Sequence, residues 1–116
     1  MLSSAAPNVV SKEGFRMLLD DGYQAAVVCE VAAEMRHTQW AGRWIVRALG
    51  GEGRGDFILV STRGNLRARE FKTTLGLISF LAEMGFENVC IPLRGGTSAI
   101  QHAPERSADG SPQSPS

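Results

Sequence analysis

The spacing of the apolar residues changes near Trp40, and this change restricts the chain to a fold that mixes helices with strands. Before residue 37 the apolar residues recur at intervals of three and four, which is the helical period. After Trp40 the period becomes two, as in a strand, over residues 44–49. The chain is therefore predicted to begin with helices and to continue with strands.

Two helices are predicted in the first part of the chain, over residues 11–21 and 23–36. Ser11 is a suitable N-cap for the first helix. In the second, a wide apolar face is predicted opposite two acidic residues, although the run 27–29 could also begin a strand. The apolar stripe holds Val27, Val31 and Met35, and the acidic pair is Glu30 and Glu34. Together the two segments predict a helical hairpin.

The remainder predicts a β-β-β-α-β unit, and the fold class is therefore α+β. The strands are expected at 44–49, 57–62, 66–71 and 89–93, with the helix at 73–84 packed on a small, mostly antiparallel sheet. The helix is expected to contact the sheet through Leu75, Ile78, Leu81 and Ala82, widened by Leu77, Phe80 and Met84. Pro92 lacks an N–H group, which favours a sheet edge for the last strand.

The glycine-rich segment 50–56 is predicted to connect two strands. A phosphate-binding loop would open a helix, and the Gly-Lys-Ser/Thr ending of that motif is missing here.

Composition predicts one domain over residues 9–96, after a frayed segment 1–8 and before a disordered Ser/Pro-rich tail 97–116. No apolar run has the length of a membrane span, and the first residues lack the pattern of a secretory leader. A cytoplasmic protein that binds no membrane is the resulting expectation.

The chemistry-bearing residues do not predict an enzyme. Cys29 and Cys90 lie in apolar stretches and are expected to be small buried residues. His37 and His102 have no nucleophile or carboxylate in a convincing context. The expectation is a protein without catalytic residues, metal or cofactor.

Charge is unevenly distributed, although the net charge of the chain is zero. Residues 41–94 contain eight basic and five acidic residues, a net of +3. In a strand 66–71, Arg67 and Arg69 would share the face opposite Leu66 and Ala68, and would point outward if those two residues face the core. The two arginines would lie about 7 Å apart, which is the spacing of successive phosphates. The candidate DNA-contacting residues are Arg63, Arg67, Arg69 and Lys72. An ordinary solvated sheet face is the alternative interpretation of these charges.

Residues 57–67, 71–73 and 77–85 form the pattern apolar strand, Arg-Gly turn, basic strand, Phe-Lys-Thr, amphipathic helix, Gly. This pattern resembles the ParC-like partition-associated accessory proteins of plasmids. It is also similar to the three-stranded, helix-backed arm-binding domains of phage integrases, in which the sheet lies on DNA. The resemblance covers roughly residues 43–93. The partition-type resemblance implies a role in plasmid maintenance beside a partition apparatus.

Two functions are therefore expected, apart from an enzyme with an unrecognised site. The first is a non-enzymatic accessory protein of a plasmid or other mobile element, acting in DNA maintenance or partition or its regulation. Its partners would be DNA or a partition or regulatory protein. The second is a homodimeric protein-interaction module that binds no nucleic acid, with strand 89–93 or helix 23–36 as its surface.

Overall fold

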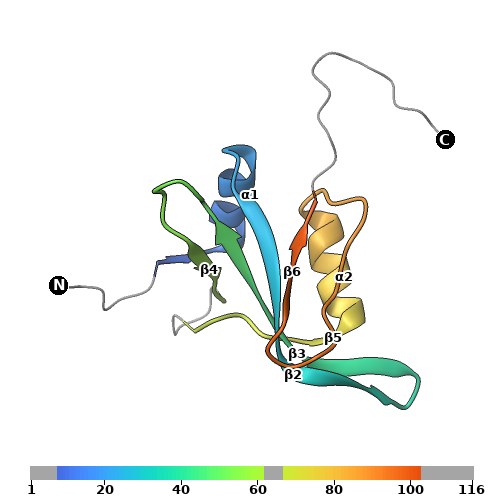
Figure 1. Cartoon of the computed structure of the whole chain (residues 1–116). Helices are drawn as coiled ribbons and strands as arrows, with labels where there is room; N and C mark the ends of the chain where they lie inside the picture. Colours follow the sequence, from blue (N-terminus) through green and yellow to red (C-terminus); the bar gives the residue numbers. More distant parts are fainter. Residues whose placement is uncertain (1–7, 62–66, 103–116) are drawn as a thin grey trace.

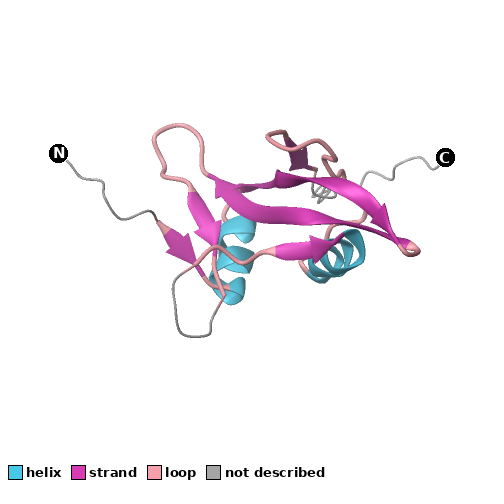
Figure 2. Ribbon diagram, turned by 90° about the horizontal axis from the view of Figure 1, so that it is seen from below, coloured by secondary structure: helices cyan, strands magenta, loops and turns pink. Residues whose placement is uncertain are grey.

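A computed structural model describes residues 8–61 and 67–102. It shows a curled six-stranded sheet of mixed strand direction with two helices packed against one face (Figures 1 and 2). In chain order the elements are β1 (Val9–Val10), α1 (Lys12–Asp20), β2 (Gln24–Arg36), β3 (Gln39–Leu49), β4 (Phe57–Leu59), β5 (Phe71–Thr73), α2 (Thr74–Glu83) and β6 (Ser98–Gln101).

The strand order is β1-β4-β3-β2-β6, with β5 paired separately to β3. Only β1 and β4 run parallel; the other pairs are antiparallel. The glycine-rich segment 50–56 connects the antiparallel strands β3 and β4, which confirms its prediction as a hairpin connection.

The predicted helical hairpin is wrong, because residues 24–36 form strand β2. Every odd-numbered residue of this stretch is apolar: Ala25, Val27, Cys29, Val31, Ala33 and Met35. Residues four apart satisfy both the helical period and the strand period of two, so the stripe that suggested a helix is equally a strand pattern. Pairing with β3 on one edge and β6 on the other supplies the contacts that select the strand.

The β2–β3 hairpin is longer than the rest of the sheet and extends away from it (Figure 1). Two register shifts lie between Cys29 and Val31 and between Val31 and Glu34, where β2 advances one residue more than β3. Such bulges increase local twist. They accompany the point at which the hairpin leaves the main sheet.

The predicted third strand, 66–71, differs from the structure. β5 comprises only residues 71–73, and Ala68 forms an isolated antiparallel bridge with Val60. β4 pairs with β3 only at Arg47 and Ala48, near the end of β3. β5 pairs nearer the start of β3, at Ala41 and Trp44. The edge of β3 is thus shared by two short partners, which accounts for the curl of the sheet.

Both helices are confirmed, with the caps that local sequence predicts. The Ser11 and Thr73 hydroxyls accept hydrogen bonds from the backbone N–H groups of Gly14 and Gly76, each at 3.1 Å. α2 ends in a Schellman motif: Phe86 N–H donates to the Leu81 carbonyl, and Gly85, with φ of 104°, donates to the Ala82 carbonyl.

The core lies between the sheet and the two helices. Its fully buried large residues are Trp44, Phe15, Leu59, Leu77, Leu81, Val27 and Val46. The buried face of α2 comprises Leu77, Phe80, Leu81 and Met84, whereas Leu75, Ile78 and Ala82 are exposed. The prediction was therefore wrong to count Leu75, Ile78 and Ala82 among the residues of α2 that contact the sheet.

The end of the described chain also differs from expectation. Residues 89–93 form no strand, and the edge strand is instead β6, which pairs with β2. β6 lies inside the segment predicted as a disordered tail; residues 103–116 lie outside the described residues. The Gln101 side chain is buried and hydrogen-bonds both the N–H and the carbonyl of Cys90. Cys29 is buried as expected, but Cys90 is exposed.

Candidate anion-binding site

Basic side chains are the only candidate functional groups that the sequence singled out, and the structure separates them. Arg63 lies outside the described residues. Arg67 and Lys72 are exposed, and Arg69 is half-buried. The Arg69 guanidinium stacks over the Phe71 ring at 4.8 Å and lies 5.4 Å from the centre of the Phe80 ring.

Arg67 and Arg69 project to the same side of the sheet, since they flank Ala68, which pairs with Val60. That side carries the helices, because Arg69 contacts the core residues Phe71 and Phe80. The strand pattern had placed these arginines opposite the core. Lys72 follows the buried Phe71 in β5 and therefore points to the opposite side, so the four residues do not share one contact face.

Among the described residues, the predicted DNA-contacting residues form no ion pair with a carboxylate, whereas most other basic residues do. Carboxylate partners lie within 4.0 Å of Lys12, Arg36, Arg43, Arg47 and Arg54. Within the described residues, Arg67, Arg69, Lys72 and Arg94 form no ion pair, and neither does Arg16, which hydrogen-bonds a carbonyl. The segment 67–72 therefore contributes three cations that form no ion pair within the described residues, while its own carboxylate, Glu70, pairs with Arg43.

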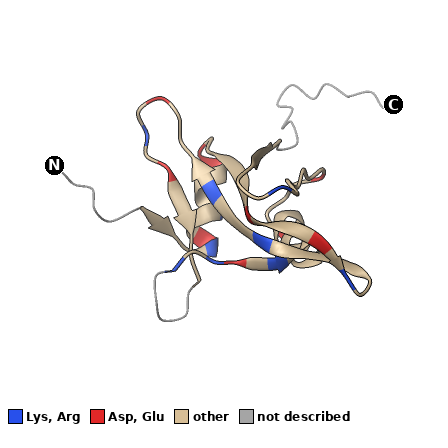
Figure 3. Ribbon diagram, turned by 60° about the horizontal axis from the view of Figure 1, so that its bottom comes forward, with Lys and Arg blue, Asp and Glu red and all other residues tan. Residues whose placement is uncertain are grey.

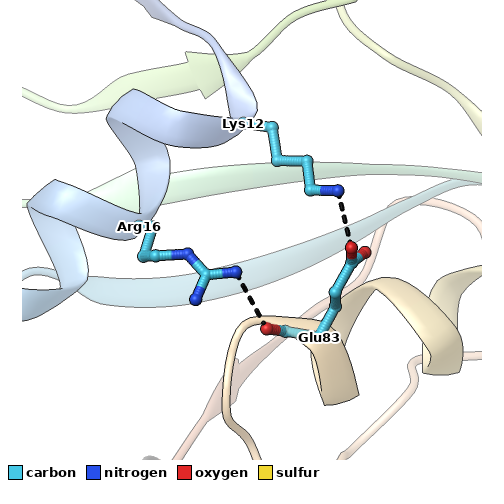
Figure 4. Close-up of polar contacts among 3 residues, drawn as sticks. All are labelled: Lys12, Arg16 and Glu83. Atoms are coloured by element: carbon cyan, nitrogen blue, oxygen red, sulfur yellow. Dashed lines mark hydrogen bonds and ion pairs between the residues drawn. The ribbon is translucent and has the colours of Figure 1, made fainter.

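Two residues of α1, Lys12 and Arg16, contact Glu83 at the end of α2 (Figure 4), and the charge of Arg69 also acts on the Glu83 carboxylate. The Lys12 ammonium contacts the Glu83 carboxylate at 2.7 Å, and the Arg16 guanidinium donates to the Glu83 carbonyl at 3.1 Å. The pKa of Glu83 is lowered, mainly by the hydrogen bond and charge of Lys12 and then by the charges of Arg16 and Arg69. We call Lys12, Arg16, Arg67 and Arg69 the basic cluster.

Lys12 and Arg16 were missed in the sequence because they are far from residues 63–72. A signal was available, since residues four apart on a helix lie on the same face. Only the packing of α1 beside α2 brings this face to Glu83 and to Arg69.

The chemistry available in the basic cluster is the binding of an anion. The charges of Lys12, Arg16 and Arg69 act on a single carboxylate, Glu83, that is already engaged by Lys12. Arg67 lies two residues before Arg69, on the same side of the sheet. The Arg69 guanidinium lies over the Phe71 ring and near the Phe80 ring, and the N–H groups at its rim can donate to phosphate oxygens.

Basic and acidic residues are interspersed along the strands (Figure 3). On the described sheet surface away from the helices, the arginines of β3 are paired with carboxylates. Arg43 lies 3.3 Å from Glu30 and 3.7 Å from Glu70, and Arg47 lies 3.8 Å from Asp56. These carboxylates neutralise the two arginines, so the surface has little attraction for an anion.

In the described ranges 8–61 and 67–102, no group of three or more His, Cys, Asp or Glu residues could hold a metal ion. Neither of the two described helices has the length and apolar character needed to cross a membrane.

Replacing Glu83 with glutamine tests the electrostatic core of the cluster. The partners, Lys12 first, lower the folded-state pKa of Glu83 below that of the unfolded chain, so the carboxylate stabilises the fold above its unfolded-state pKa. The stabilisation disappears as pH falls through the lowered pKa. We expect Glu83→Gln to be less stable than wild type near pH 7 and equally stable near about pH 2, measured by urea unfolding. A difference that persists in acid would contradict this account.

Comparison with models of known protein families, with curated proteins and with solved structures gives no match to this chain.

Proposed function

We propose that this chain is a non-enzymatic accessory protein that binds the phosphate backbone of DNA through the basic cluster. The observation that carries the proposal is the convergence of cations from α1 and from the segment before β5 on a single carboxylate. Arg69, which acts on Glu83 by its charge without an ion pair, and its neighbour Arg67 form no ion pair among the described residues.

Phosphate is favoured over other anions by the kind of donors present. Three of the four side chains are arginines, whose planar N–H groups match phosphate oxygens. Arg67 and Arg69 flank one residue of an extended segment, so their stems lie about 7 Å apart, close to the spacing of phosphates along a strand. Contacts of this kind position a protein on DNA without reading its sequence.

The biological setting comes from the resemblance to ParC-like plasmid proteins. It implies that the DNA belongs to a plasmid or another mobile element, and that binding serves its maintenance or partition. A zero net charge suits such a role, because the protein would bind locally through one cluster and would not coat DNA.

The decisive experiment is a fluorescence-anisotropy titration of double-stranded DNA at several salt concentrations. Wild-type protein is expected to bind at low salt and to weaken steeply as salt rises, because phosphate contacts release counterions. The double variant Arg67→Ala with Arg69→Ala should bind more weakly, and its slope of log affinity against log salt should fall by about two.

The matched control removes the same charge elsewhere. Lys72 and Arg94 are exposed and form no ion pair in the described part of the chain, but Lys72 points to the other side of β5 and Arg94 precedes β6. Lys72→Ala with Arg94→Ala should leave most of the binding intact. Equal losses in both double variants would overturn the assignment to the basic cluster. Wild-type protein that does not bind at low salt would overturn the DNA-binding function itself.

A further inference from the structure

The tip of the β2–β3 hairpin exposes two large apolar side chains that have no role in the core. Met35 is 53% exposed and Trp40 is 41% exposed. The two residues lie directly opposite each other in the register of β2 and β3, so their side chains share one face of the hairpin. Large apolar side chains paired on a projecting hairpin are typical of a surface that contacts another protein.

The outer edge of β2 beside Met35 is unpaired within the described residues. Arg36 and Gln39 close a two-residue turn and therefore form a hydrogen-bonded pair. In an antiparallel ladder the next pair, Met35 and Trp40, is not hydrogen-bonded, so the N–H and carbonyl of Met35 point away from β3. Ala33, two residues earlier, points the same way and donates to the Leu93 carbonyl at 2.9 Å.

No described strand continues this outer edge past Ala33. β6 pairs with β2 only from Ala25 to Val28, and the chain around Leu93 reaches no further than Ala33. Among the residues that the structure describes, the outward N–H and carbonyl of Met35 therefore have no strand partner, and such an edge is a template for pairing with another strand.

The charges beside Met35 are complementary to themselves. Glu34 and Arg36 flank Met35, and within the chain their side chains approach only to 3.9 Å, with both more than 60% exposed. If two copies of residues 34–36 pair antiparallel about Met35, each Glu34 lies opposite the Arg36 of the other copy. Opposite charges facing each other across a strand pair stabilise it, and like charges destabilise it.

We propose that a second copy of this chain docks on the hairpin tip, through antiparallel pairing of residues 34–36 of β2 with the same residues of the partner. The arrangement is isologous, with a two-fold axis through the Met35 pair and perpendicular to the sheet. Such an axis keeps side chains on their own face, so Trp40 and Met35 of both copies form one continuous apolar row. The pairing extends the sheet from β3 and β2 of one copy into β2 and β3 of the other.

Charge exchange tests this pairing by sedimentation equilibrium over a concentration series. Glu34→Lys and Arg36→Glu alone each turn two symmetric contacts from attraction to repulsion, so each should weaken dimerisation by about tenfold or more. The double variant with both exchanges restores every opposed pair and should dimerise within about threefold of wild type. Glu87→Lys, at an exposed acidic residue that forms no ion pair with any described residue, controls for the change in net charge.

Three outcomes would overturn the proposal. The first is a wild-type protein that stays monomeric up to about 1 mM. The second is a dimer that none of the single exchanges weakens, which would place the interface elsewhere. The third is a double variant no better than the single variants. The test of dimerisation is independent of DNA binding, because none of these variants changes a residue of the basic cluster.

Discussion

Replacing Trp44 with alanine is expected to destabilise the protein by about 3–5 kcal/mol, the usual range for deleting a fully buried tryptophan. Trp44 has no exposed surface, and its indole N–H donates to the Pro92 carbonyl at 2.8 Å. A Cβ atom added to Gly42 would lie 3.2 Å from the Trp44 ring, so the ring occupies space that glycine leaves open. The variant loses this packing and leaves the Pro92 carbonyl unpaired.

Urea unfolding followed by circular dichroism measures the loss, at protein concentrations low enough to exclude self-association. Trp40 in the same strand is the matched control, since it is 41% exposed. Trp40→Ala should change the free energy of unfolding by no more than about 0.5 kcal/mol. Similar losses in the two variants would show that Trp44 is not the centre of the core.

A chain ending after Gly96 is expected to melt more than about 10 °C below the full chain. The truncation removes β6, and with it the pairing of Ala25–Val28 on one edge of β2. It also removes both hydrogen bonds between the Gln101 side chain and the backbone of Cys90. These two bonds hold the segment after α2 against β6. Each lost bond contributes about 0.5–1.5 kcal/mol, and the total is several kcal/mol.

The control for the truncation is a chain ending after His102, which keeps β6. It should melt close to the full chain, because the Ser- and Pro-rich residues that follow have little apolar surface to bury. Thermal melting followed by circular dichroism compares the three lengths. An unchanged melting temperature after truncation at Gly96 would mean that β6 contributes nothing to the fold.

The candidate site shows the same limit of sequence-based reasoning as the fold. The sequence predicted that Arg67 and Arg69 share a face. In the structure the two residues flank Ala68, which bridges to Val60, and they therefore project to the same side of the sheet. It did not predict that this face carries the helices, or that Lys12 and Arg16 approach from α1. Those contacts depend on how α1 and α2 pack, which is decided by residues far apart in the chain.

The sequence by itself determined the features whose causes lie within a few residues. α1 and α2 follow from an N-cap hydroxyl at Ser11 or Thr73, and α2 ends at a glycine that adopts positive φ. The connection 50–56 follows from its glycines and from the strands on either side.

Only the tertiary structure decided β2 and β6. The apolar residues of 24–36 fit a helix and a strand equally well, and the strand forms because β3 and β6 pair with its two edges. β6 has too few apolar residues to predict order, and it is held by β2 and by the bonds between Gln101 and Cys90. Strand pairing joins residues distant in sequence, so local spacing carries no signal for it.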